Sequence, residues 1–95
     1  MFTTLETVRA EALFVSDLQP SEQPDGAAVR HAVARALCRF RVRGCAARVA
    51  GEFGDHPEDG ARRMRWALAC VRAAYPCQNA DDPTAAAVTG LAVAA

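Results

Sequence analysis

Ninety-five residues suffice for one small domain with a modest core, since domains typically span about 50–250 residues. Apolar residues make up 52% of the chain, yet 22 residues are Ala and none is Ile, a composition that favours an all-α fold. The eleven basic residues, all Arg, are balanced by eleven acidic ones, so the net charge of zero argues against generic binding to nucleic acid or membranes.

The sequence predicts a cytoplasmic protein. The N-terminus lacks the basic segment and apolar run of a secretory signal peptide. No stretch approaches the roughly 18 uninterrupted apolar residues that a membrane-spanning helix needs. In the cytoplasm the four cysteines are expected to be reduced thiols, because that compartment does not favour structural disulfides.

A first helix is predicted over residues 4–15. Thr3 and Glu6 have the spacing of a capping box, in which each side chain bonds to the other residue's backbone N–H. The apolar residues that share one helical face are Leu5, Val8, Ala12 and Val15. Phe14 and Leu18 lie off this face, which predicts a second apolar contact for this helix.

A second helix is predicted to begin near Pro24, where the fixed φ of proline suits a first turn, and to end between residues 41 and 44. Its apolar stripe consists of Val29, Ala32, Val33, Ala36, Leu37 and Phe40. The alternation in residues 39–43 also fits a short strand, but the chain offers no partner strand, so a helix is preferred.

A helical hairpin is predicted over residues 45–75. Its first helix, about 45–53, buries Cys45, Val49 and Phe53, and Gly54 provides a left-handed cap. Its second helix begins with an Asp55–Glu58 capping box around Pro57 and ends before Pro76. The apolar face of that helix consists of Met64, Ala67, Leu68, Val71, Ala74 and Tyr75.

These elements predict a compact all-α domain of three to four helices over residues 1–78, with the hairpin at its centre. Residues 79–95 are rich in Ala and contain few large side chains, so they are predicted to form a flexible, disordered tail.

Two segments, EALFVSDLQPSEQP (11–24) and GCAARVAGEFGDHPEDGARRMRWA (44–67), resemble a family of small uncharacterised actinobacterial helical proteins. The resemblance covers most of residues 5–75. It implies a compact, mostly helical domain in a cytoplasmic setting, and it implies no activity, cofactor or site residue.

The sequence predicts neither a metal site nor an enzyme. The cysteines form two pairs of equal spacing, Cys38 with Cys45 and Cys70 with Cys77. Sulfurs two helical turns apart, roughly 10 Å, cannot share one tetrahedral ion. Thiol catalysis needs a base within hydrogen-bond reach, and no spacing brings His31 or His56 to a cysteine. We therefore expect no cofactor, no metal and no catalytic residue.

A DNA-associated regulator is one functional hypothesis, because residues 45–75 have the outline of a helix-turn-helix. The arginines that would contact nucleic acid are Arg62, Arg63, Arg65 and Arg72. Glu58 and Asp59 would enter a groove first, and their charges repel phosphate. An alternative is that the basic helices simply face the acidic N-terminal part of the chain.

The preferred hypothesis is a non-enzymatic module that binds another protein or forms a homodimer. Trp66 lies away from the apolar face of its helix, with Arg63 one turn before it and Cys70 one turn after it. Trp and Arg are enriched at binding hot spots, so these three residues form the predicted partner-binding face. The alternative is that Trp66 belongs to the core and is covered by the first helix.

Overall fold

The computed structural model of the chain describes residues 4–76, and within this range the protein is all-α, as predicted. Its elements are α1 (Leu5–Phe14), the short 3-10 helix η1 (Pro20–Glu22), α2 (Gly26–Asp55) and α3 (Pro57–Ala74). The predicted tail, residues 79–95, lies outside the described residues, as does the boundary proposed for it.

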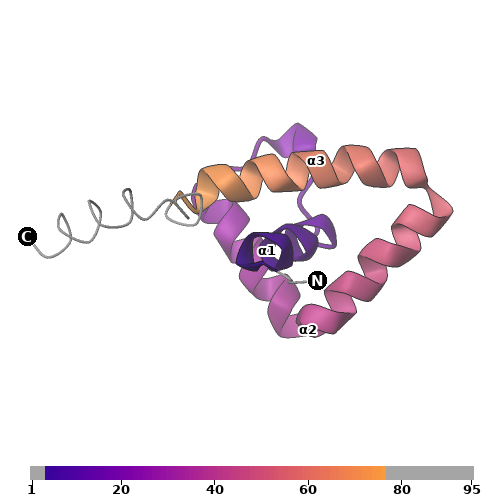
Figure 1. Cartoon of the computed structure of the whole chain (residues 1–95). Coiled ribbons are helices and arrows are strands. Elements are labelled where there is room, and N and C mark those ends of the chain that lie inside the picture. The colour runs from indigo at the N-terminus through magenta and orange to yellow at the C-terminus, as the bar shows by residue number, and fades with distance from the viewer. Residues whose placement is uncertain (1–3, 77–95) are drawn as a thin grey trace, which may run out of the picture.

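The long helix α2 bends sharply, and its two halves form a triangular frame with α3, within which α1 lies (Figure 1). All three α-helices contact one another. The core therefore forms around α1, and its largest fully buried side chains are Leu13, Val29, Cys45 and Val71.

The N-terminus of α1 is capped by Thr4, whose Oγ1 accepts a hydrogen bond from the Thr7 backbone N–H at 3.0 Å. The predicted capping box of Thr3 with Glu6 is wrong, because the cap lies one residue later and the Glu6 carboxylate pairs with Arg72 instead. A Thr-Thr pair offers two consecutive capping hydroxyls, and the spacing to Glu6 favoured the wrong one.

The buried face of α1 also differs from the predicted one. Its buried residues are Ala10, Ala12, Leu13 and Phe14, whereas Leu5 is 55% exposed. Since α2 and α3 both pack against α1, its C-terminal half is enclosed on several sides and no single stripe describes it. The second apolar contact expected of Phe14 is confirmed, since this side chain is only 5% exposed.

The first half of α2 follows the prediction closely. Asp25 caps it, with its Oδ1 accepting from the Ala28 N–H at 2.8 Å, so the helix begins two residues after Pro24. In the predicted stripe, Val29, Val33 and Ala36 are buried. The other three residues are partly buried and pack against the core: Ala32, Leu37 and Phe40.

The two helices predicted on either side of residues 41–44 are joined through a single non-helical residue, Arg41, with φ 64° and ψ 172°. This part of backbone space is essentially reserved for glycine, because a Cβ is strained there. The predicted end of the second helix, between residues 41 and 44, is therefore confirmed at Arg41. The next helix begins directly after this residue and not at residue 45, so α2 changes direction at one residue and continues as a helix at once.

The turn between α2 and α3 is shorter than predicted. Helix α2 runs to Asp55, no described glycine has a positive φ, and His56 alone links the two helices. Both the Gly54 cap and the Asp55–Glu58 capping box are therefore wrong, since the N-cap of α3 is His56, which makes no side-chain bond. Pro57 occupies the first turn, as predicted.

Helix α3 buries the face that its periodicity predicts. Ala67, Val71 and Ala74 are buried, and Met64, Leu68 and Tyr75 pack partly buried against the core. Near the turn the rings of Phe14 and Phe53 stack with centroids 6.1 Å apart, although Phe53 is 36% exposed. Gly60 lies against the Phe53 ring, and its lack of a side chain leaves room for that ring near the turn between α2 and α3.

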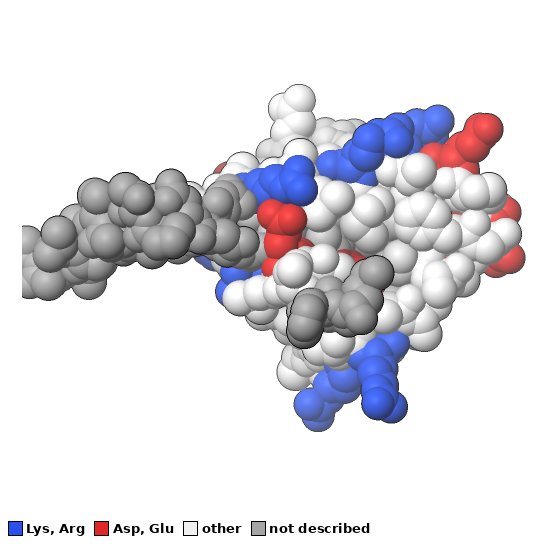
Figure 2. All heavy atoms as spheres, viewed as in Figure 1, with Lys and Arg blue, Asp and Glu red and all other residues white. Residues whose placement is uncertain are grey.

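Charged side chains are distributed around the edges of the face shown in Figure 2. Basic side chains lie along α3 and below the bend of α2, and acidic side chains lie beside those of α3 (Figure 2). This view shows no continuous basic surface, which matches a chain with a net charge of zero.

Candidate functional site

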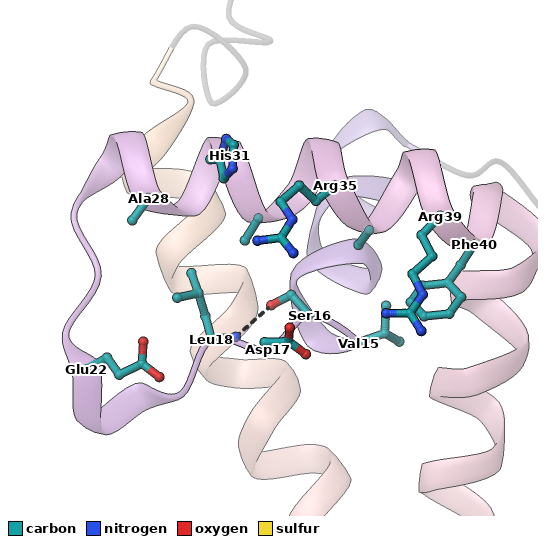
Figure 3. Close-up of a pocket in the computed structure, with 12 residues that line it drawn as sticks. Val15, Ser16, Asp17, Leu18, Glu22, Ala28, His31, Arg35, Arg39 and Phe40 are labelled. Carbon is teal, nitrogen blue, oxygen red and sulfur yellow. Dashed lines mark hydrogen bonds between the residues drawn. The ribbon is translucent and has the colours of Figure 1, made fainter.

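A pocket of about 340 Å³ lies between residues 15–22 and the first half of α2 (Figure 3). Its apolar lining residues are Val15, Leu18, Ala28, Ala32, Ala36 and Phe40. The alanines at 28, 32 and 36 recur every four residues and share one helical face, and their short side chains leave the space open. None of the predicted site residues lines this pocket.

The segment opposite α2 is held in place by local hydrogen bonds of Ser16. Its hydroxyl donates to the Leu13 carbonyl at 2.6 Å and accepts from the Leu18 N–H at 3.3 Å. The hydroxyl thus replaces the helical bonds that are lost where α1 ends, and it directs the chain so that Leu18 lines the pocket under α2 (Figure 3).

Basic and acidic side chains surround the pocket. His31, Arg35 and Arg39 come from α2, and Asp17 and Glu22 come from the opposite segment. All five are exposed. The Arg35 guanidinium extends from α2 toward Ser16 and Asp17 (Figure 3). Within residues 4–76 neither of the two carboxylates forms an ion pair with these arginines, so both signs of charge remain available to a ligand.

Arg63 lies behind this pocket and fastens the end of α1 to α3. Its guanidinium donates to the carbonyls of Phe14, Ser16 and Leu18 at 2.7, 3.1 and 2.9 Å. The Phe14 carbonyl belongs to the last turn of α1 and the other two follow it, a region where backbone acceptors lack helical partners. Burial lowers the pKa of Arg63, while the negative charge of Glu52 opposes that shift. Arg63 therefore positions the segment that forms one wall of the pocket.

The predicted partner-binding residues, Arg63, Trp66 and Cys70, are all half-buried on α3. The Arg63 guanidinium lies 4.8 Å from the centre of the Trp66 ring, and Trp66 is partly buried against the core. Cys70 instead lines a smaller hollow of about 240 Å³ between α3 and the start of α2, which also contains Pro24 and Gly26. Burial raises the pKa of the Cys70 thiol. The Arg63 guanidinium and the Trp66 ring are thus in contact, and Cys70, one turn further along α3, lines the smaller hollow.

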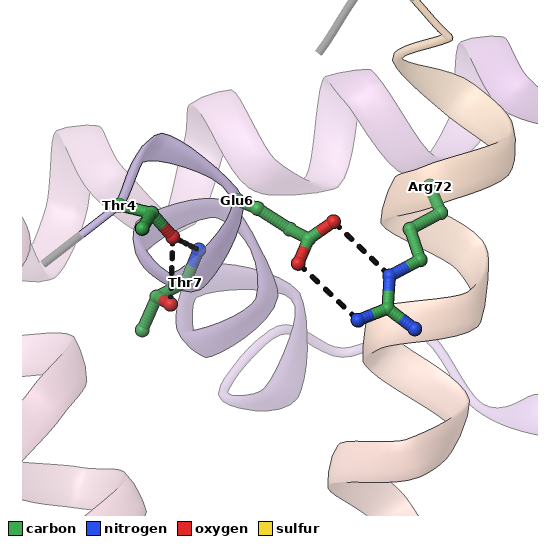
Figure 4. A network of polar contacts seen from close by, with 4 residues as sticks. All are labelled: Thr4, Glu6, Thr7 and Arg72. Carbon is green, nitrogen blue, oxygen red and sulfur yellow. Dashed lines mark hydrogen bonds and ion pairs between the residues drawn. The ribbon is translucent and has the colours of Figure 1, made fainter. Parts of the chain in front are cut away.

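Three of the four arginines proposed for nucleic-acid contact have partners within the chain. Arg62 pairs with Asp59 at 2.8 Å, and Arg63 holds the end of α1. Arg72 donates to both oxygens of Glu6, at 3.0 and 3.3 Å (Figure 4). This pair is one instance of the predicted contact between the acidic N-terminal part and a basic helix. Arg65 is exposed.

The described cysteines and histidines belong to no cluster that could hold a metal ion. Residues 4–76 contain no group of three or more His, Cys, Asp or Glu side chains that could hold a metal ion. Burial raises the pKa of the Cys45 thiol, and Glu11 adds to this effect. A raised pKa disfavours the thiolate that a nucleophilic cysteine needs. Cys38, Cys45 and Cys70 are free thiols.

No helix in the described part of the chain is long and apolar enough to cross a membrane. Compared with protein-family models, curated proteins and solved structures, the chain matches none of them. The resemblance to actinobacterial helical proteins therefore stays a prediction.

Proposed function

We propose that this protein is a non-enzymatic protein-interaction module, and that its pocket receives an apolar side chain from a partner polypeptide. The observation that carries this proposal is the pocket's composition: an apolar interior of Val, Leu, Ala and Phe side chains with exposed charges of both signs around it. Apolar centres with polar rims are the usual anatomy of protein interfaces.

The size of the pocket favours one anchoring side chain over a large cofactor. Its volume of about 340 Å³ lies at the lower end of the roughly 300–1,000 Å³ typical of ligand sites. Within residues 4–76 no polar or charged residue is fully buried, so the floor offers no desolvated group for catalysis. The charges around the pocket favour a partner with a carboxylate that reaches Arg35 and a cation that reaches Asp17 or Glu22.

Selection from a phage-displayed library of random dodecapeptides tests this function. The pocket is blocked by Ala32→Phe, which adds an apolar ring where Ala32 lines the floor. The matched control is Ala34→Phe, because Ala34 is exposed on the same helix and does not line the pocket. Thermal unfolding followed by circular dichroism verifies that both variants fold.

We expect wild type and Ala34→Phe to enrich peptides with an apolar anchor flanked by charges of both signs. We expect Ala32→Phe to bind those peptides at least about tenfold more weakly, a difference of roughly 1.4 kcal/mol. Equal binding by a folded Ala32→Phe variant, or the absence of any enriched sequence, would refute the assignment of this pocket.

A DNA-associated regulator is a second candidate, with Arg65 as the exposed arginine of α3 that would contact a phosphate. It has less support, because Arg62, Arg63 and Arg72 already contact acidic groups or carbonyls in the chain. An anisotropy titration with random duplex at low salt tests it, since phosphate contacts bind most tightly there. Saturable binding that Arg65→Ala weakens would favour this candidate.

We place the module in the cytoplasm as part of this proposal. The three described cysteines are unpaired, and Cys38 is exposed. Such free thiols fit a reducing compartment.

A further inference from the structure

The bend at Arg41 divides the described chain into two parts that interlock. Residues 4–40 contain α1 and the first half of α2, and residues 42–76 contain the second half of α2 and all of α3. Arg41 holds a backbone conformation, φ 64° and ψ 172°, that strains every residue except glycine. A helical conformation at this residue would remove that strain and make α2 continuous.

Polar contacts of three arginines and of Cys45 join one part to the other. These contacts are those of Arg63 with Phe14, Ser16 and Leu18, of Arg72 with Glu6, of Arg30 with the Ala74 carbonyl, and of Cys45 with the Ala36 carbonyl. The stacked rings of Phe14 and Phe53 also belong to different parts. Every one of these contacts can be re-formed if residues 42–76 come from a second copy of the chain.

The burial pattern of α2 favours such an exchange. At roughly 100° per residue, the buried positions Val29, Val33 and Ala36 lie about half a turn away from Cys45 and Val49 on a straight helix. A straight α2 in a single chain would therefore cover α1 with one half only. In a pair of straight helices that cross at Arg41, each half faces the α1 of a different unit.

The positions of the buried residues are also symmetric about Arg41. Val33 and Val49 lie equally far before and after it, and so do Leu37 and Cys45, all of which belong to or pack against the core. A two-fold axis through the crossing point would place Val33 of one chain level with Val49 of the other, and Leu37 level with Cys45. An isologous interface requires such a symmetric arrangement.

We propose that the chain forms a domain-swapped homodimer, in which α2 straightens at Arg41 and residues 42–76 pack onto residues 4–40 of a second copy. Domain swapping exchanges identical elements between protomers and needs no new contact inside either unit. The pocket of the proposed function is lined only by residues between 15 and 40, so each unit keeps an intact pocket. The swap is independent of what that pocket binds.

The backbone at residue 41 provides the first test. Arg41→Gly accommodates the bend without strain and should favour the monomer, whereas Arg41→Ala loses the same side chain and keeps the strain. By size-exclusion chromatography with light scattering, we expect wild type and Arg41→Ala to dimerise with similar affinity, and Arg41→Gly about tenfold more weakly. A wild type that stays monomeric at millimolar concentration after heating and cooling, or equal dimerisation of all three proteins, contradicts the proposal.

Complementation distinguishes a swap from any other dimer. Leu13→Asp disrupts the core from residues 4–40, and Val71→Asp disrupts it from residues 42–76, because both side chains are fully buried. Each variant alone should be unfolded. When the two are mixed, a swapped heterodimer contains one unit without a substitution, so we expect about half of the helical circular dichroism signal to return. A mixture that stays as unfolded as its components contradicts the swap.

Discussion

The arginines of α3 that contact α1 and the arginines beside the pocket serve different purposes. In residues 42–76, Arg63 and Arg72 reach across to α1 and hold it through carbonyls and a carboxylate. In residues 4–40, Arg35 and Arg39 stand at the edge of the pocket without an ion pair in the described structure. The same residue type thus stabilises the fold where acceptors lie within reach, and stays available for a partner where they do not.

The largest expected effect separates these two purposes directly. Arg63→Ala removes three hydrogen bonds and leaves partly buried carbonyls without donors, so we expect the free energy of unfolding to fall by about 2–3 kcal/mol. Arg35→Ala should change it by less than about 0.5 kcal/mol, because this side chain is exposed. Urea denaturation measures both variants, and equal destabilisation would abolish the distinction between them.

A smaller effect is expected from two glycines in the second half of α2. Gly51→Ala should stabilise the fold by about 0.5–1 kcal/mol, since a new Cβ meets no atom within 4 Å and Ala is the better helix former. Gly44→Ala makes the same chemical change, but its Cβ would lie 3.2 Å from the Phe40 Cβ, across the bend. The melting temperature of Gly51→Ala should therefore exceed that of Gly44→Ala. The reverse order would mean that the backbone at the bend moves enough to accommodate the new Cβ at residue 44.

The smallest expected effect is a pH dependence from Cys45. Burial raises the pKa of this thiol above its ordinary value of 9.0, so the folded state keeps a proton that the unfolded chain releases. The resulting stabilisation is complete below that value and is lost as the pH rises through the folded pKa. Urea denaturation between about pH 8 and pH 10 should show a shallower decline for Cys45→Ala than for the exposed control Cys38→Ala. If the stability of both variants falls equally with pH, the Cys45 thiol does not contribute to the pH dependence.

Periodicity predicted most of the helices because the first half of α2 and the whole of α3 each present one stripe to the core. The stripe around Val33 and the face around Val71 both follow from helical spacing alone. The prediction failed for α1, where Leu13 and Phe14 are buried because the frame encloses the helix on several sides. Burial on several sides leaves no periodic signal.

Two further features depend on contacts that no local pattern encodes. The end of the second helix was predicted only as a range, residues 41–44, because nothing in the identity of Arg41 indicates that it takes the non-helical conformation. The role of Arg63 depends on carbonyls 45 to 49 residues away. The alanines lining the pocket do recur every four residues, from Ala28 to Ala36, but Ala is also the common helix former, so its spacing alone did not indicate a cavity.

The bonds of Arg63 couple the pocket to α3 thermodynamically. The carbonyls of Ser16 and Leu18 accept from Arg63, and the same two residues line the pocket. A peptide that binds the pocket more tightly when this segment is fastened must strengthen the attachment of α3 by the same factor, because linkage is reciprocal. Peptide binding to the pocket would then be tighter when α3 is docked. In a domain-swapped dimer the pocket and the α3 docked beside it belong to different chains, so the two chains would be coupled.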